Sequence, residues 1–366
     1  MTTALLAGGG TAGHVNPLLA LADYWRSVEP NVEVLVLGTA EGLEARLVPE
    51  RGYELLTIPR VPFPRRPDRA ALSFPGRFRD AVRQTRAIIR DRGVDAVVGF
   101  GGYASAPAYV AARLERIPIV AHEANARPGI ANRLAVWLGG QLAITFAGTP
   151  LGRARLVGMP LRAEITTLDR PERRAEARKQ LGLEPVRPVL LVTGGSTGAQ
   201  RLNETMTSSA ARVLGAGWQV LHVTGTGRGG DDPGLAGYRT LAYCDRMELA
   251  FAAADLVVCR AGAATVSELA VLGLPAVLVP YAAGNGEQRL NARELVAVGG
   301  AVLVADAEFT PEWVTRTLVP LLDRRDEIAR MAAAAQTVGR RDGDAALLAL
   351  VRESLADELA EAGCDD

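Results

Sequence analysis

The sequence is poor in cysteine and has no long apolar run. Its three cysteines, Cys244, Cys259 and Cys364, lack metal-binding spacing, and their odd number fits a reducing compartment better than a disulfide framework. No segment reaches the ~20 apolar residues of a membrane-spanning helix, so membrane contact should be peripheral. The first ten residues lack a basic flank and run straight into glycines, which predicts a first strand rather than a signal peptide. We therefore expect a cytoplasmic protein.

The chain also has no net charge, because its 41 Lys and Arg residues balance its 41 Asp and Glu residues. No global charge therefore favours nucleic acid, and none is expected as a partner. Aromatic residues make up only 5% of the chain, whereas hydrophobic residues make up 48% and glycines number 39. This composition is typical of parallel strands rich in Ala, Val and Leu, joined by glycine turns. The length of 366 residues predicts two domains of an α/β protein.

One structural plan occurs twice along the chain. The apolar strand Leu5 to Ala7 enters a Gly-Gly-Thr-x-Gly turn before a helix from about Asn16 to Trp25, and Leu190 to Thr193 enters a similar turn. Each copy is followed by a second strand, glycine turn, helix and Pro-marked strand. A single glycine loop can serve ordinary helix–sheet packing, but four in register favour phosphate binding at helix N-termini. The repeat predicts two Rossmann-like domains whose parallel sheets face a cleft, with a boundary near Gly158.

The two copies differ after the glycine loop, where His14 in the first copy corresponds to Ala199 in the second. An imidazole at this place suits a general base that removes a proton from an acceptor hydroxyl, and a capping or packing histidine is the alternative. His122, Glu123 and Asn125 follow another strand and are expected at the same edge, where they could bind sugar hydroxyls. Asn125 could instead cap the next helix.

In the second half, the stretch Arg260 to Glu268 reads as a glycine turn that enters a helix. Its N–H groups suit a diphosphate, and Glu268 could hold a ribose diol. The alternative is a capping box in which Thr265 caps the helix and Glu268 completes the pair. The loop Gly284 to Asn291 offers further amide and carboxylate groups to a sugar.

A basic and apolar stretch lies between about residues 60 and 79. Arginines interleave there with apolar residues, and each basic residue is worth on the order of 1 kcal/mol near an anionic membrane surface. A solvated Pro-rich loop followed by an amphipathic helix is the alternative. The side chains expected at the membrane are Arg60, Arg65, Arg66, Arg69, Phe74 and Phe78.

Several motifs together resemble one family. They are Gly9 to His14, Phe100 to Pro107, His122 to Asn125, Gly158 to Arg162, Gly194 to Ala199 and Gly262 to Glu268. In order and spacing they are similar to the MurG family of bacterial UDP-N-acetylglucosamine:lipid I N-acetylglucosaminyltransferases. The resemblance runs from about Leu5 to Val304. It implies a GT-B fold and inverting transfer of N-acetylglucosamine to undecaprenyl-diphospho-N-acetylmuramoyl-pentapeptide, which forms lipid II.

The resemblance also assigns places and roles. It implies an acceptor and membrane-side domain over residues 1–158, joined by a C-terminal helix at about 340–360, and a UDP-sugar domain over 159–339. It implies a peripheral enzyme of peptidoglycan synthesis at the cytoplasmic face of the cell membrane, linked to cell shape and division, without an essential metal or cofactor. His14 would be catalytic. The implied donor-binding residues are Thr11, Ala12, Gly13, Asn125, Arg162, Ser196, Cys244, Ala263, Ala264, Thr265, Val266, Ser267, Glu268 and Gln288.

Three other functions remain open at the level of sequence. Two are enzymatic: a UDP-N-acetylglucosamine 2-epimerase with the same two-domain plan, and a glycosyltransferase with a soluble acceptor. The third is a nucleotide-sugar-binding regulator without catalysis. The loop that ends in His14 and the basic, apolar stretch favour the lipid-linked acceptor over the first two.

Overall fold

The computed structural model describes residues 1–64, 69–195, 198–226, 232–282 and 286–362. It divides into two compact units, which are treated separately below. Unit 1 comprises Met1–Arg162 together with Asp342–Asp366, and unit 2 comprises Ala163–Arg341. None of the helices in the described part of the chain combines the length and the apolar character needed to cross a bilayer.

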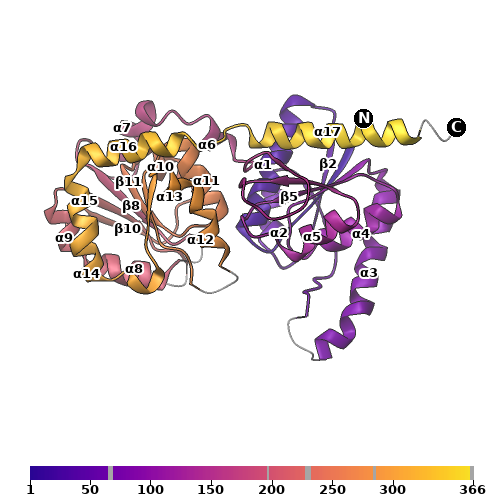
Figure 1. Ribbon diagram of the computed structural model, residues 1–366, viewed down its shortest axis with the longest axis horizontal. Helices are drawn as coiled ribbons and strands as arrows, with labels where there is room; N and C mark the ends of the chain where they lie inside the picture. The colour runs from indigo at the N-terminus through magenta and orange to yellow at the C-terminus, as the bar shows by residue number, and fades with distance from the viewer. Residues whose placement is uncertain (65–68, 196–197, 227–231, 283–285, 363–366) are drawn as a thin grey trace. The chain divides into compact units, whose positions relative to one another are not determined.

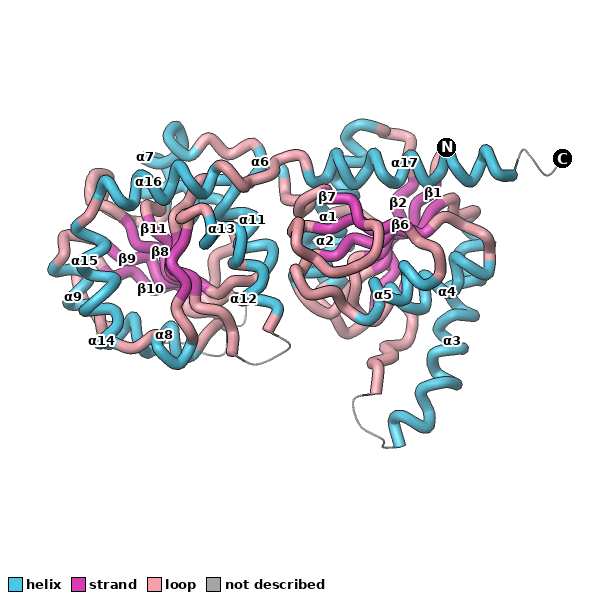
Figure 2. Tube along the Cα trace, in the orientation of Figure 1, coloured by secondary structure: helices cyan, strands magenta, loops and turns pink. Residues whose placement is uncertain are grey.

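Unit 1 is built on a parallel sheet with the strand order β3-β2-β1-β4-β5-β6-β7 (Figures 1 and 2). Its strands are β1 (Thr3–Ala7), β2 (Glu33–Gly38), β3 (Glu54–Thr57), β4 (Ala96–Gly99), β5 (Ile119–Glu123), β6 (Gln141–Ile144) and β7 (Ala154–Leu156). Its helices are α1 (Ala12–Val28), α2 (Glu44–Glu50), α3 (Arg69–Arg92), α4 (Ser105–Leu114), α5 (Ile130–Trp137) and α17 (Gly343–Ala362).

Side-chain alternation along β1 gives this sheet two buried faces. Ala4 and Leu6 belong to a core with residues of α1 and α17, such as Leu18 and Leu347. Leu5 and Ala7 point to the other face, which is covered by α3, α4 and α5. Because successive side chains of a strand point to opposite faces, burial on both sides requires a continuous apolar run. The run Ala4–Ala7 meets that requirement.

Unit 2 repeats the architecture with a parallel sheet ordered β10-β9-β8-β11-β12-β13. Its strands are β8 (Val189–Thr193), β9 (Gln219–Val223), β10 (Tyr238–Leu241), β11 (Leu256–Cys259), β12 (Ala276–Leu278) and β13 (Ala301–Leu303). Its helices are α6 (Ala163–Thr166), α7 (Arg170–Gln180), α8 (Gln200–Ser208), α9 (Ala210–Gly215), α10 (Met247–Ala253), α11 (Ala263–Leu272), α12 (Glu287–Asn291), α13 (Arg293–Ala297), α14 (Pro311–Trp313), α15 (Val319–Asp323) and α16 (Arg325–Gln336), with a 3-10 turn η1 (Asp306–Glu308) and a π-helical turn η2 (Val314–Leu318).

The core of unit 2 gathers on the face covered by α8, α9 and the segment from η2 to α16. Leu190 and Val192 of β8 pack there with Leu202, Trp218 and Leu318. The prediction of two Rossmann-like α/β units with parallel sheets is confirmed.

Candidate functional site

Each sheet contains one point at which the chain reverses its direction of travel across the strands. In unit 1 this point lies between β1 and β4, because β2 and β3 extend the sheet from β1 whereas β5 to β7 extend it from β4. Open parallel sheets bind ligands at such points, beyond the carboxyl ends of the strands. The glycine loop after β1, which contains Gly9, meets the glycine loop after β4, which contains Gly102. Gly102 has φ +82°, and a Cβ built on it would lie 2.4 Å from the carbonyl oxygen of Gly9, so only glycine allows this approach.

His14 lies in the first turn of α1, beside both loops. Its Nδ1 is 3.1 Å from the carbonyl oxygen of Gly9 and 3.3 Å from Oγ1 of Thr11. A carbonyl oxygen only accepts, so Nδ1 carries the proton and the neutral ring keeps its lone pair on Nε2. A Cβ at Gly101 would lie 3.1 Å from Nε2, so glycine at that position leaves room beside the lone pair. In this tautomer Nε2 is the ring nitrogen that can accept a proton.

The electrostatic surroundings keep this imidazole neutral. Burial lowers the pKa of His14, and the hydrogen bond to Gly9 and the charges of Glu123 and Glu44 oppose this effect without cancelling it. A pKa below the ordinary value leaves the ring unprotonated at neutral pH, as a base must be. Thr11, the residue before α1, makes no side-chain cap, and its carbonyl oxygen accepts from the N–H groups of His14 and Val15, each at 3.1 Å.

His122 and Glu123 differ from the sequence expectation. His122 is 0% exposed and Glu123 is 3% exposed, so neither side chain is available to a sugar. Nε2 of His122 donates to the carbonyl oxygen of Gly158 at 2.9 Å. Burial lowers the pKa of His122 to about 4. This histidine is a neutral part of the core of unit 1.

Glu123 anchors the loop that follows β5. Its carboxylate accepts from the backbone N–H groups of Asn125 at 3.0 Å and Gly129 at 2.9 Å, and from Nδ2 of Asn132 at 2.8 Å. The loop is thus fixed by an acidic side chain beneath it, and Asn125 itself remains partly exposed at the carboxyl edge of the sheet. Arg162, the last residue of the first part of unit 1, is also partly exposed.

In unit 2 the chain reverses its direction across the sheet between β8 and β11. The loop after β8 and the short loop from β11 to α11 therefore both lie at this point. Ser196 lies outside the described residues. The helix α11 begins at Ala263, and Gly262 is the residue before it. Thr265 is therefore the third residue of the helix, and the predicted capping box is wrong. With no side chain on Gly262, the first N–H groups of α11 stay available to an anion.

The predicted donor-binding stretch covers the first two turns of this helix. Ala263 and Val266 are buried, whereas the remaining residues are partly exposed: Ala264, Thr265, Ser267 and Glu268. Gln288, in α12, accepts a hydrogen bond at Oε1 from the backbone N–H of Tyr281 at 2.9 Å. This contact orients the amide, so its NH₂ group points away from Tyr281 and can donate.

Arg260, the residue after β11, links the segments that follow β12 and β13, a role that the sequence did not indicate. Its Nη1 donates to the carbonyl oxygens of Val279 at 3.0 Å and Pro280 at 3.3 Å and to Oδ1 of Asp306 at 2.5 Å. The guanidinium is thereby engaged with the segment that leads to Gln288. Arginine suits this task because its donors have a fixed planar geometry.

Cys244 lies in the loop after β10, at the carboxyl edge of the sheet, and is partly exposed. Burial raises the pKa of its thiol, so the thiol stays neutral at physiological pH. Cys259, at the end of β11, is buried, and its pKa is raised to about 12. Cys364 lies outside the described residues. Neither described cysteine is poised as a nucleophile.

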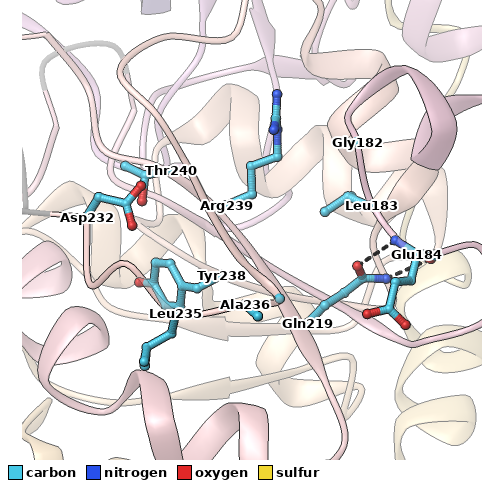
Figure 3. A pocket seen from close by; sticks show the side chains of 11 residues that line it. Gly182, Leu183, Glu184, Gln219, Asp232, Leu235, Ala236, Tyr238, Arg239 and Thr240 are labelled. Atoms are coloured by element: carbon cyan, nitrogen blue, oxygen red, sulfur yellow. Dashed lines mark hydrogen bonds between the residues drawn. The ribbon is translucent and has the colours of Figure 1, made fainter.

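A separate cavity of 330 Å³ lies at the opposite edge of the sheet of unit 2 (Figure 3). Gln219 and Tyr238, the first residues of β9 and β10, line it. Gln219 is fully engaged with the backbone, because its Oε1 accepts from Glu184 N and its Nε2 donates to the carbonyl oxygens of Glu184 and Arg187, each at 2.8 Å. None of the predicted site residues lines this cavity. Among the described residues, no group of three or more His, Cys, Asp or Glu side chains is placed to hold a metal ion.

The expected membrane side chains differ in their accessibility. Phe63, Phe74 and Phe78 form a cluster with ring centroids 5.4 to 6.4 Å apart and pack against the core, so Phe74 and Phe78 are only partly exposed. Leu72 is 84% exposed and is the apolar side chain available there. The guanidinium of Arg60 lies over the ring of Tyr103, 4.6 Å from its centroid. Arg65, Arg66 and the side chain of Arg69 lie outside the described part of the chain.

Two parallel sheets of this kind, each with glycine loops at its reversal point, define the GT-B class of glycosyltransferases. Residues 4–143 match the model of the glycosyltransferase family 28 N-terminal domain, and residues 189–347 match that of the glycosyltransferase family 28 C-terminal domain. The chain belongs to glycosyltransferase family 28.

Similar proteins agree with this assignment. A UDP-N-acetylglucosamine–N-acetylmuramyl-(pentapeptide) pyrophosphoryl-undecaprenol N-acetylglucosamine transferase of Clavibacter michiganensis is 59% identical over 97% of both chains. A protein of the same name from Streptomyces coelicolor is 50% identical over 96% of this chain and 98% of its own. The crystal structure of Acinetobacter baumannii MurG has a TM-score of 0.77 at 28% identity, covering 96% of this chain and all of that one.

The epimerase alternative shares the fold alone. The structure of a putative UDP-N-acetylglucosamine 2-epimerase from Listeria monocytogenes has a TM-score of 0.71 with 13% identity, over 98% of both chains. The resemblance to MurG that the sequence motifs indicated is confirmed by relatives of much higher identity.

Proposed function

We propose that this enzyme transfers N-acetylglucosamine from UDP-N-acetylglucosamine to the lipid-linked N-acetylmuramoyl-pentapeptide lipid I, which forms lipid II for peptidoglycan synthesis. Relatives that are 50% and 59% identical, over at least 96% of both chains, are named for this activity. The observation that supports the chemistry is the neutral His14 ring, whose Nδ1–H is held by Gly9 and whose Nε2 lone pair stands beside a glycine.

The two units have different roles in this proposal. Unit 1 supplies the base and binds the acceptor, and unit 2 supplies most of the residues that bind the donor. The N-terminus of α11 receives the diphosphate, with Arg162 and Ser196 as further ligands, while Glu268 holds the ribose and Gln288 the sugar. The loop around Cys244 meets the uracil through its main chain. Because main-chain N–H groups and arginine can neutralise the diphosphate, transfer needs no divalent metal in this proposal.

The reaction balances as a single displacement. Nε2 of His14 removes the proton from the acceptor hydroxyl as its oxygen attacks the anomeric carbon. The bond between that carbon and the phosphate oxygen breaks, and UDP leaves with the electron pair while the sugar is inverted to a β-1,4 link. The helix dipole of α11 stabilises the charge that develops on the leaving diphosphate. Thr11, Ala12, Gly13 and Asn125 of unit 1 are further donor-binding residues in this proposal.

The enzyme works at the cytoplasmic face of the membrane in this proposal. Its acceptor carries an undecaprenyl chain, and the exposed Leu72 lies in a segment rich in arginine. An anionic headgroup layer attracts such a segment.

The substitution His14→Ala tests the proposal. Loss of a positioned general base should lower the rate of transfer roughly 100-fold or more. Donor affinity should stay near that of the parent, because α11, Glu268 and Gln288 are unaltered. Transfer to a lipid I analogue is followed chromatographically, and donor binding is measured by calorimetry. Near-normal transfer by the variant would rule out the base, and release of an epimerised sugar by the parent would favour the epimerase.

A further inference from the structure

A buried carboxylate lies directly beneath the first glycine loop. Glu44, the first residue of α2, is 0% exposed. Its Oε2 accepts from the backbone N–H of Gly10 at 2.8 Å, and its Oε1 accepts from the N–H of Thr39 at 3.0 Å and from Oγ1 of Thr39 at 2.7 Å. Burial alone would raise the pKa of this carboxyl, but the hydrogen bonds lower it below its ordinary value. Glu44 is therefore charged at neutral pH.

Three glycines, one after β1 and two at the end of β2 and in the loop after it, make room for this carboxylate. A Cβ would approach side-chain atoms of Glu44 to 2.3 Å at Gly9, to 2.6 Å at Gly38 and to 2.0 Å at Gly42. Contacts below 3 Å between such atoms do not occur without rearrangement. The close packing of backbone around Glu44 shows that its position is tightly specified.

The same peptide group contacts Glu44 at one end and His14 at the other. The N–H of the peptide between Gly9 and Gly10 donates to Oε2 of Glu44, and the C=O of that peptide accepts from Nδ1 of His14 at 3.1 Å. A peptide is planar and rigid, so a contact at one end fixes the orientation of the other. Gly10 adopts φ +87°, a conformation that glycine permits at little cost.

We propose that Glu44 is the positioning residue of His14 and acts through this one peptide group. The inference rests on the proposed function, in which Nε2 of His14 is the base. A negative charge on the N–H side polarises the peptide and makes its carbonyl oxygen a stronger acceptor. That oxygen then holds the proton on Nδ1, which keeps the lone pair on Nε2 and supports the positive charge that the ring acquires in the reaction.

Several other charged or titratable groups lie near His14. The charge of Glu123, at the end of β5, favours a higher pKa of the His14 ring, as the charge of Glu44 does. Tyr103 lies next to Gly10, and its hydroxyl accepts from Nη2 of Arg60 at 3.2 Å. Glu123 serves the loop after β5 and has no contact with the Gly9–Gly10 peptide among the described residues. Glu44 alone of the two carboxylates is bonded to that peptide.

The test compares Glu44→Gln with Glu41→Gln, which removes an equal charge from an exposed position on the same loop. Nitrogen NMR of labelled histidine reports the tautomer and the pKa of each ring. Assignment is simple because the chain has three histidines, and burial lowers the pKa of His122 and of His222 to about 4. His14 is thus the ring to follow.

In the parent, His14 should show a protonated Nδ1. In Glu44→Gln, part of the population should shift its proton to Nε2, and the pKa of His14 should fall by on the order of one unit, because a buried negative charge that favours the imidazolium is lost. The acidic limb of the profile of kcat/KM against pH should move to lower pH, and the plateau should drop on the order of tenfold. Glu41→Gln should change none of these.

A purely structural role would lower the plateau and leave the tautomer, the pKa and the acidic limb where they are in the parent, and this result would overturn the proposal. If Glu44→Gln does not fold, Glu44→Asp provides the same test, since the shorter carboxylate cannot reach Gly10 and Thr39 together. A parent-like His14 tautomer in folded Glu44→Asp would also overturn it. An active His14→Ala enzyme would refute the base and leave the NMR outcome for Glu44 intact, so the two failures can be told apart.

Discussion

Buried neutral His122 predicts that unit 1 loses stability in mild acid. In the unfolded chain its pKa is near 6.5, and in the folded unit it is about 4. Between these values the unfolded state binds a proton that the folded state does not, so the free energy of unfolding falls as pH drops below 6.5 and levels off below 4. The cost works out at about 2 kcal/mol at pH 5 and about 3 kcal/mol at pH 4, relative to pH 7.

The variant His122→Gln separates this effect from the titration of carboxylates. Glutamine stays neutral, and its amide can still donate to the carbonyl oxygen of Gly158, as Nε2 of His122 does. The parent should therefore lose about 2 kcal/mol more than the variant between pH 7 and pH 5. The variant itself is expected to be less stable at pH 7, because glutamine does not fill the place of the ring against Phe100.

Urea titrations at both pH values, read by hydrogen exchange, supply the measurement. Peptides from β1 and β5 report unit 1, and peptides from β8 and β11 report unit 2. Unit 2 contains His222, whose pKa is also lowered to about 4 by burial, so its own acid sensitivity should be the same in parent and variant. Equal losses of stability in unit 1 for parent and variant would refute the reasoning, since a His122 that charges without cost is not held neutral by burial.

Two further predictions concern the substrates. Glu268→Ala should raise the Michaelis constant for the donor roughly 10- to 100-fold and leave the saturated turnover nearly unchanged, because the ribose that we propose it holds does not react. Steady-state kinetics beside the exposed control Glu312→Ala decides this, and a collapsed turnover at an unaltered Michaelis constant would contradict it. Leu72→Ser combined with Arg79→Ser should weaken binding to anionic vesicles roughly tenfold or more. Sedimentation with vesicles tests this against Val186→Ser, a control on unit 2 where Val186 is 92% exposed, and equal binding by both variants would exclude the segment.

The fold could be predicted from sequence because its signals are local. Apolar runs such as Leu190 to Thr193, followed by glycines and a helix, carry the strand, the turn and the helix within about twenty residues. Boundaries were less accurate: the helix expected from about Asn16 begins at Ala12. A helix can start inside a glycine-rich turn when its first N–H groups need no internal partner, and composition alone does not reveal that.

The chemistry of single side chains was harder to predict. His122 and Glu123 stand in a motif that suggests a ligand site, yet both are buried, because the last residues of β5 still lie between covered faces of the sheet. Glu44 was missed for the opposite reason. It is 34 residues from Gly10 in sequence, and only the pairing of β1 with β2 brings the segment after β2 under the loop after β1. The glycines at 38 and 42 gave no usable signal, since the acidic residue between them is the exposed Glu41 and Glu44 follows the second glycine.

The order of the chain through the two units has a consequence for biosynthesis. The core beside α1 in unit 1 includes Leu347, Leu348, Leu350 and Val351 of α17, which follow unit 2 in the sequence. A ribosome that has finished Arg162 must add about 180 residues before it reaches α17, which takes on the order of 10 to 40 s at ordinary rates. Throughout that interval one face of the nascent sheet is covered by α1 but lacks α17 and exposes leucine and valine side chains, whereas unit 2 emerges as one uninterrupted segment. The nascent first unit is therefore a client for chaperones that bind apolar surface, and translation that stops before residue 343 leaves a chain with one completed unit and one that is prone to aggregate.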